Sequence, residues 1–170
     1  MTHFSINGLK SAALSVLIIA GATSASYADS NRVTIQQFGT VHSLGIGQNG
    51  QYNRLSVTQR GHSNLSVQMQ DGRRNATTID QSGRFNDVFT HQNGRRNTTV
   101  VGQQGRGNGA LTTQTGRDNV LGVAQFGRNN SADVDQLGRH NAIGVIQAGN
   151  GNTATTVQSG RGNVAVIVQD

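Results

Sequence analysis

Residues 103–114 read QQGRGNGALTTQ and contain one complete copy of the pattern on which the fold depends. Gln103 is followed two residues later by Gly105 and five residues later by Asn108, and the next Gln of the pattern is Gln114. This unit, Gln-x-Gly-x-x-Asn-x5, extends in both directions without an insertion or deletion and covers residues 31–169. A repeat this regular indicates an array of identical structural elements.

Three residue types occupy fixed positions of the eleven-residue unit. The Gln positions are Gln37, Gln48, Gln59, Gln70, Gln81, Gln92, Gln103, Gln114, Gln125, Gln136, Gln147, Gln158 and Gln169. The Gly positions are Gly39, Gly50, Gly61, Gly72, Gly83, Gly94, Gly105, Gly116, Gly127, Gly138, Gly149 and Gly160. The Asn positions are Asn31, Asn53, Asn64, Asn75, Asn86, Asn97, Asn108, Asn119, Asn130, Asn141, Asn152 and Asn163, with His42 as the one exception. A disordered Gln/Asn-rich chain has no need of such register.

Hydrophobicity within the unit alternates with a period of two. If the seven residues from Asn to Gln form a β-strand, then Asn, the second and fourth residues after it, and Gln share one face. The thirteen strands place 26 residues between Asn and Gln on that face, of which 19 are Ala, Val, Leu or Ile, five are Thr, and none is charged. A helix with an eleven-residue period is geometrically possible, but a Gly in every unit and runs such as VAVIV at 164–168 favour strands.

The four residues between strands include the repeated Gly, which adopts positive φ at little steric cost. Two strands and two turns form a 22-residue coil, and coils stacked about 4.8 Å apart form a rod of roughly 30 Å. We therefore predict an all-β fold, a β-solenoid with two facing parallel sheets and an amyloid-like cross-β arrangement. Large residues of one sheet, such as Leu121, face small residues of the other, such as Ala110.

Buried Gln and Asn side chains would be costly without partners. Stacked in register, they are expected to form amide ladders with their copies one coil above and below. The composition agrees, because the 17 Gln and 17 Asn are accompanied by no proline, and a proline would remove a donor from the ladder.

Residues 1–28 are predicted to be a secretory signal peptide. Lys10 supplies a positive charge, SAALSVLIIA at 11–20 forms a short apolar run, and Ser26-Tyr27-Ala28 suits cleavage after a small residue. Ala25 is a second possible cleavage position. A membrane anchor would need about 20 apolar residues. The mature domain, residues 29–170, then carries 13 Arg against 8 Asp, a net charge of +5.

Arginine follows the turn Gly in eight units, at Arg73, Arg84, Arg95, Arg106, Arg117, Arg128, Arg139 and Arg161. Arg74 and Arg96 add to these turns, and Asp71 and Asp118 partly offset the charge. Two interpretations remain open. The arginines either limit premature aggregation, or bind anionic surfaces such as lipopolysaccharide, acidic polysaccharide or extracellular DNA. We expect no aromatic residue to stack beside them, which argues against specific recognition of nucleic acid.

No catalytic, metal or cofactor site is predicted. The absence of cysteine excludes disulfides and Cys-based chemistry. His42, His62, His91 and His140 occupy different positions of the unit, and Asp133 and Asp135 lack a third ligand. We therefore expect a protein that is not an enzyme.

The unit resembles the curlin repeat, Ser-x5-Gln-x-Gly-x2-Asn-x-Ala-x3-Gln. Residues 103–114, 125–136 and 147–158 follow its Gln-to-Gln portion position by position. Where the major curli subunit has Ser at the start of a strand this chain has Asn, which is closer to the minor, nucleating subunit. The resemblance implies secretion, export of an unfolded chain through an outer-membrane pore with periplasmic and extracellular accessory proteins, and templated assembly into extracellular amyloid on the bacterial surface.

The functional expectation is a structural subunit of curli-type fibres used for cell adhesion, aggregation and biofilm matrix. It would polymerise head to tail with itself and with a partner curli subunit, because neither end of the solenoid has spare sequence to cover it. Residues 31–48 are a candidate for recognition by the export pore. The alternatives are a minor nucleator at the outer surface or an ice-binding solenoid; against the latter, one outward column is irregular, with Thr34, Ser56, Thr78, Val100, Gly122, Gly144 and Val166. Two exposed apolar strands, residues 65–69 and 164–168, are candidates for lateral or nucleating contacts.

Overall fold

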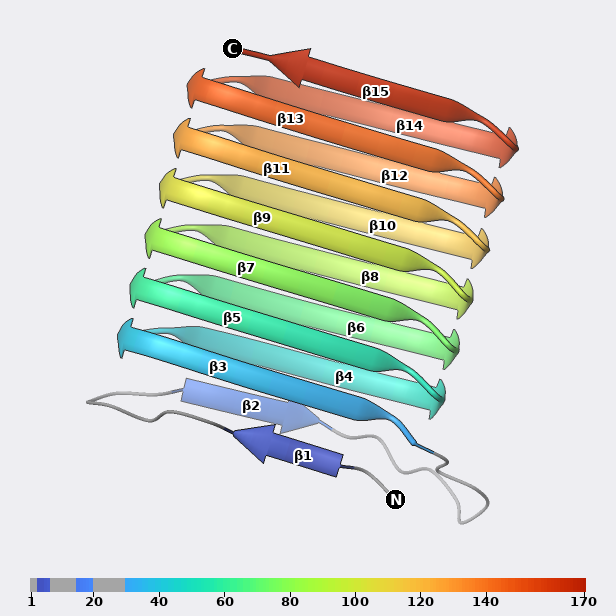
Figure 1. Ribbon diagram of the computed structural model, residues 1–170, viewed down its shortest axis with the longest axis horizontal. Helices are drawn as coiled ribbons and strands as arrows, with labels where there is room; N and C mark the ends of the chain where they lie inside the picture. Colours follow the sequence, from blue (N-terminus) through green and yellow to red (C-terminus); the bar gives the residue numbers. More distant parts are fainter. Residues whose placement is uncertain (1–2, 7–14, 20–29) are drawn as a thin grey trace.

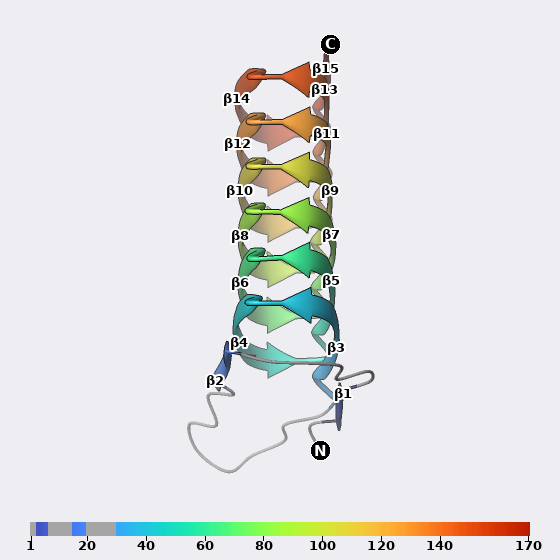
Figure 2. The same ribbon diagram turned by 90° about the vertical axis from the view of Figure 1, so that its left-hand side faces the viewer.

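Each eleven-residue unit forms one strand of a rod in which the chain winds alternately through two sheets (Figures 1 and 2). The structure, a computed structural model, describes residues 3–6, 15–19 and 30–170. The strands are β1 (His3–Ile6), β2 (Ser15–Ile19), β3 (Arg32–Thr40), β4 (Ser43–Gln51), β5 (Arg54–His62), β6 (Leu65–Arg73), β7 (Ala76–Arg84), β8 (Asp87–Arg95), β9 (Thr98–Arg106), β10 (Gly109–Arg117), β11 (Val120–Arg128), β12 (Ser131–Arg139), β13 (Ala142–Asn150), β14 (Thr153–Arg161) and β15 (Val164–Gln169).

The odd-numbered strands form one sheet, in the order β1-β3-β5-β7-β9-β11-β13-β15, and the even-numbered strands form the other, in the order β14-β12-β10-β8-β6-β4-β2. Neighbours in each sheet are parallel and in register, so that Gln103 pairs with Gln125 and Gly105 pairs with Gly127. Figure 2 shows the two sheets facing each other along the whole rod. The predicted β-solenoid with 22-residue coils is confirmed.

The strands are longer than predicted. Instead of running from Asn to Gln, each strand from β3 to β14 has nine residues that begin after the Asn and continue past the Gly. The reason is that Gly105, with φ of 133°, still pairs with Gly127 of the next coil. The chain therefore bends at Gly without leaving the ladder, and only two residues, such as Gly107 and Asn108, separate one strand from the next.

The core is a narrow layer between the sheets, and its residues are those of the predicted inward face. Val57, Val88, Leu121 and Val134 are fully buried. Ala165 and Ile167 on β15 are only partly buried, because no coil lies beyond them among the described residues. The two sheets approach closely since large residues of one oppose small residues of the other.

Most of the predicted signal peptide lies outside the described residues. Its two described segments, β1 and β2, pair in parallel with β3 and β4 and so extend the two sheets at the N-terminal end of the rod. No helix among the described residues is long and apolar enough to cross a membrane.

Candidate self-assembly interface

The glutamines of the repeat form two continuous side-chain ladders, one in each sheet. Along both ladders the Nε2 of one Gln donates to the Oε1 of the Gln 22 residues later, over 2.6–3.0 Å. The second Nε2 hydrogen binds a backbone carbonyl of the other sheet, as where Gln81 on β7 donates to Leu65 O on β6 at 2.9 Å. Interior members such as Gln81 and Gln114 are fully buried. Each interior Gln of a ladder thus satisfies its amide while connecting one coil to the next.

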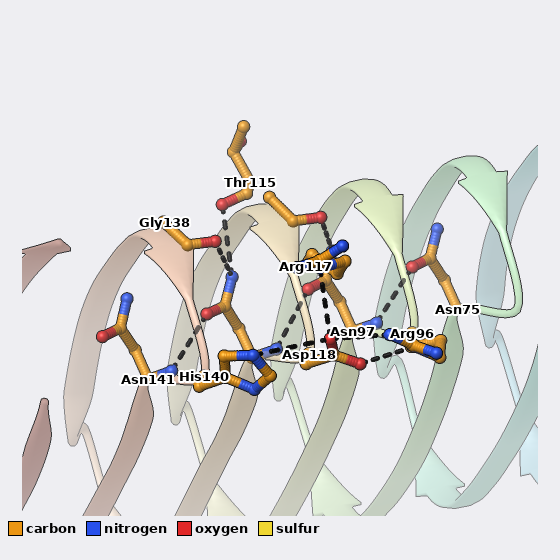
Figure 3. A network of polar contacts seen from close by, with 11 residues as sticks. Asn75, Arg96, Asn97, Thr115, Arg117, Asp118, Gly138, His140 and Asn141 are labelled. Atoms are coloured by element: carbon orange, nitrogen blue, oxygen red, sulfur yellow. Dashed lines mark hydrogen bonds and ion pairs between the residues drawn. The ribbon is translucent and has the colours of Figure 1, made fainter. Parts of the chain in front are cut away.

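The asparagines also connect successive coils, but through the backbone. Asn97 Oδ1 accepts from the backbone N of Asn119 at 3.2 Å, while Asn97 Nδ2 donates to Asn93 O at 3.1 Å and Gly116 O at 3.2 Å. Figure 3 shows the same contact one coil earlier, where Asn75 Oδ1 accepts from Asn97 N at 3.1 Å. The Oδ1-to-backbone bond recurs from Asn53 to Asn163 at 2.9–3.2 Å, except at Asn64. Each Asn in this series therefore bonds to its copy one coil further on, but through the backbone N of that copy instead of its side-chain amide. A direct bond between two ladder side chains is formed where Asn86 Nδ2 donates to Asn64 Oδ1 at 3.2 Å.

His42 fills the Asn position with an equivalent set of bonds. Its Nδ1 accepts from Asn64 N at 3.3 Å, the role of Asn Oδ1, and its Nε2 lies 3.1 Å from Phe38 O, the role of Asn Nδ2. The ring is 3% exposed. These contacts require the neutral tautomer with hydrogen on Nε2.

The turn glycines are needed because successive coils touch there. A Cβ added at Gly105 would lie 1.8 Å from the carbonyl oxygen of Gly127. The residue two positions after Gly also has positive φ, including Val41 at 57° and Phe85 at 58°. Sequence reasoning missed this second left-handed position, because bulky and β-branched residues usually avoid it.

The two ends of the ladders are complementary. At the N-terminal end, the Oε1 atoms of Gln37 and Gln48 are buried and have no hydrogen-bond partner among the described residues. At the C-terminal end, β15 pairs with β13 alone and β14 pairs with β12 alone within the described chain. Every ladder Gln before the last coil donates to the Oε1 of the ladder Gln one coil further on, and Gln158 and Gln169 are the last members of the two ladders.

The arginines form columns of unequal length on the two edges of the rod. Strand register aligns one uninterrupted column of five, which contains Arg73, Arg95, Arg117, Arg139 and Arg161. The opposite edge aligns three, Arg84, Arg106 and Arg128. Arginine columns therefore lie along both edges of the rod, and the edge with five arginines carries the denser positive charge.

Asp118 is the main counter-charge on the five-arginine edge (Figure 3). Its carboxylate accepts from Arg96 Nε at 2.6 Å and Arg96 Nη2 at 2.9 Å, and Arg117 Nε lies 3.4 Å away. The hydrogen bond from Arg96 holds the pKa of Asp118 below its ordinary value. On the outer face of β8, burial raises the pKa of Asp87.

Aromatic rings do accompany some arginines, so the expectation that none would was wrong. Arg73 and Arg74 lie 5.6 and 5.7 Å from the centre of the Tyr52 ring, and Arg106 lies 5.7 Å from that of Phe85. The 22-residue stacking brings these rings over arginines distant in the sequence. The aromatic rings occupy isolated positions in the turns, where each stacks on arginine of the protein itself.

The histidines and aspartates are dispersed along the rod. Within the described part of the chain, no group of three or more His, Asp or Glu residues is arranged to hold a metal ion. Asp133 and Asp135 are exposed on the outer face of β12.

Comparison with known protein families gives a match to the Curlin associated repeat at residues 28–61, 52–83, 94–127, 116–149 and 127–155. These ranges include most of the solenoid and follow the same units that build its coils. No curated protein matches the chain.

Proposed function

The chain belongs to the curlin family, and from this premise we propose that it is a subunit of an extracellular amyloid fibre that grows by head-to-tail addition of solenoids. The observation that carries the proposal is the polarity of the Gln ladders. Buried acceptors at Gln37 and Gln48 are left open at one end, while the last members, Gln158 and Gln169, lie at the other.

A second copy stacked on β14 and β15 would continue both sheets. The ends of the rod offer unpaired strand edges, which are templates for further pairing, and a head-to-tail contact that does not close generates a filament. After removal of the signal peptide, β3 and β4 would be exposed for this contact. Secretion, a place on the bacterial surface, a partner curli subunit, an outer-membrane export pore and accessory proteins are parts of the same proposal.

The test is polymerisation of residues 29–170 followed by thioflavin-T fluorescence and fibre diffraction. We expect a lag that preformed fibres shorten, and a meridional reflection near 4.8 Å. Gln37→Leu removes the open acceptor and should slow seeded elongation. Gln36→Leu is the matched control, because the adjacent Gln36 faces outward on the same strand and should leave elongation unchanged. A chain that stays monomeric for days at micromolar concentration contradicts the proposal.

A nucleating role is the alternative within this function. Trace amounts of the aggregated protein should then shorten the lag of a major curli subunit while remaining attached to outer-membrane vesicles. A bulk fibre subunit would instead be incorporated along the length of the filament.

We also propose that the five-arginine edge binds linear polyanions. In favour of this, the arginines recur in every coil of that edge from β6 to β14, and only Asp118 forms ion pairs with this edge among the described residues. A sulfated polysaccharide should bind at low salt and be released as salt screens the charges. Arg139→Gln with Arg161→Gln should weaken binding more than Arg106→Gln with Arg128→Gln on the other edge. Equal loss would contradict the preference for this edge, and no binding by the unchanged protein would favour the purely solubilising role.

A further inference from the structure

The outer face of the odd-numbered sheet changes character along the rod. On β3, β5 and β7 the outward side chains include Arg32, Arg54 and Asp80. Each of the strands β9, β11, β13 and β15 has three outward residues that align in register into three columns along the rod, beginning at residues 98, 100 and 102. These twelve positions hold only Gly, Ala, Val, Ile and Thr. We call these outward positions of the four strands the apolar face. Its valines at 100, 120 and 166 are 47%, 51% and 69% exposed.

The centre of the apolar face is made of glycine that the fold itself does not require. Gly122 and Gly144 are register neighbours on β11 and β13, and neither has positive φ. A Cβ at Gly144 would meet nothing within 4 Å, and one at Gly122 would only touch Ile143 O at 4.0 Å. Glycine weakens a strand interior, and where no local constraint explains it, it marks a site where another backbone approaches closely.

The arrangement of side chains is self-complementary for two rods that run in opposite directions. The middle column of the face reads Val100, Gly122, Gly144, Val166, which is the same in both directions. A two-fold axis parallel to the strands, passing between β11 and β13, therefore places Gly122 opposite Gly144 of a second copy and leaves a flat centre.

The column on the Gln side supports the same axis. From β9 to β15 it reads Gly102, Ala124, Ile146, Val168. The two-fold rotation sets Gly102 opposite Val168 and Ala124 opposite Ile146, so small residues face large ones, as in well-packed cores. In two rods that run in the same direction, this column would instead face the outward column at the Asn end of the strands. Val168 would then face Val164, so that two large residues would meet.

We propose that this apolar face pairs antiparallel rods of the same protein laterally. The occupant is a second copy because the face is complementary to itself, and because the outer face of β12 on the other sheet carries Asp133 and Asp135 and does not offer an equivalent surface. Four strands spaced about 4.8 Å apart and about five residues long give an area of roughly 300 Å² per rod. Such a contact is too small for a stable complex of single chains, which needs about 1,200 Å² in total. It rests on the proposed fibre, where the face recurs at regular intervals along the rod and the contacts add.

The first experiment compares two glycine variants of the chain in fibres. Gly144→Lys places a charge in the centre of the apolar face, whereas Gly109→Lys places one on the outer face of β10 in the other sheet. At both positions an added Cβ meets nothing within 4 Å, so both variants should fold and elongate at similar rates. By electron microscopy, we expect wild-type and Gly109→Lys fibres to be paired or bundled, and Gly144→Lys fibres to be single.

The outcomes separate the two proposals. Fibres that are single in the wild type, or equally bundled in Gly144→Lys, overturn the lateral contact and leave the fibre function standing. Failure of the wild type to form fibres overturns both.

The second experiment tests the antiparallel direction with a short bismaleimide, in a chain that has no natural cysteine. Gly102→Cys with Val168→Cys should cross-link between rods, because these positions face each other across the two-fold axis and are three strands apart within one subunit. Val164→Cys with Val168→Cys should cross-link between rods only if they run in the same direction. Cross-linking of the second pair in preference to the first would overturn the inference.

Discussion

Gln68 and Gln70 lie two residues apart on β6, and both side chains are buried. Gln70 continues a ladder, with bonds to Gln48 and Gln92 of 2.6 and 2.9 Å. Gln68 occupies a core position and donates to Ser66 Oγ at 2.8 Å, but its Oε1 has no partner. The same residue type is thus stabilising at one position and unfavourable at the other.

Replacing these two glutamines should have opposite effects on stability. Gln68→Leu removes an unsatisfied buried oxygen and should raise the free energy of unfolding by about 1 kcal/mol, whereas Gln70→Leu leaves its ladder partners unpaired and should lower it by about 2 kcal/mol. The measurement is the guanidinium dependence of the β-sheet circular dichroism. A loss of stability in Gln68→Leu as large as that in Gln70→Leu would contradict this account.

The contact between Asp118 and Arg96 should make the stability of the folded chain depend on pH. The pKa of Asp118 is lowered in the folded state by Arg96, so its stabilising effect is fully present above the unfolded pKa of about 3.9 and is lost as pH falls through the folded value. At low salt, Asp118→Asn should therefore show a smaller drop in denaturation midpoint between about pH 4 and pH 2 than the wild type.

The matched control is Asp133→Asn, on the outer face of β12, where the carboxylate forms no ion pair with another described residue. This variant should keep the acid sensitivity of the wild type. Identical acid profiles for Asp118→Asn and the wild type would show that the Arg96 contact does not contribute.

At the scale of the strand, the bend at each Gly is the critical feature. Gly127→Ala puts a Cβ 2.0 Å from Gly149 O at a φ of 116°, so we expect a loss of roughly 1–3 kcal/mol from backbone strain alone and a lower denaturation midpoint. Gly109→Ala adds a Cβ in open space and should raise stability by about 0.5–1 kcal/mol. Similar midpoints for the two variants would refute the steric role of the turn.

The sequence predicted the strands better than it predicted their ends. Period two identified inward residues such as Leu121 and Val134, because burial of one face is a property of each strand alone. The continuation of pairing through Gly105 and the left-handed Val41 depend on contact between neighbouring coils. The bonds of the Asn ladder were missed for the same reason, since Asn97 Oδ1 reaches the backbone of Asn119 only after the coils stack.

For the whole molecule, the stability of a solenoid is approximately a sum over coils and the contacts between neighbouring coils. Deleting residues 97–118 removes one coil and joins Arg96 to Asn119, which is equivalent to Asn97 in register. The shortened chain should fold cooperatively with a lower denaturation midpoint, and fibres of the intact chain should still seed it.

Deleting residues 97–117 provides the control, since it differs by a single residue. It displaces all following residues by one position, which would turn inward side chains outward. We expect this variant to lose a large part of its β-sheet circular dichroism. Equal folding of the two deletion variants would contradict the requirement for strict register.

The strand-pairing hydrogen bonds from β3 to β15 connect one coil to the next and therefore lie along the rod. Under tension applied to its ends, the rod carries load through coils in series, and its strength is that of its weakest coil. Once that coil opens, its 22 residues can release a length of about 75 Å of extended chain. A filament built this way would yield in steps and absorb mechanical work before it breaks.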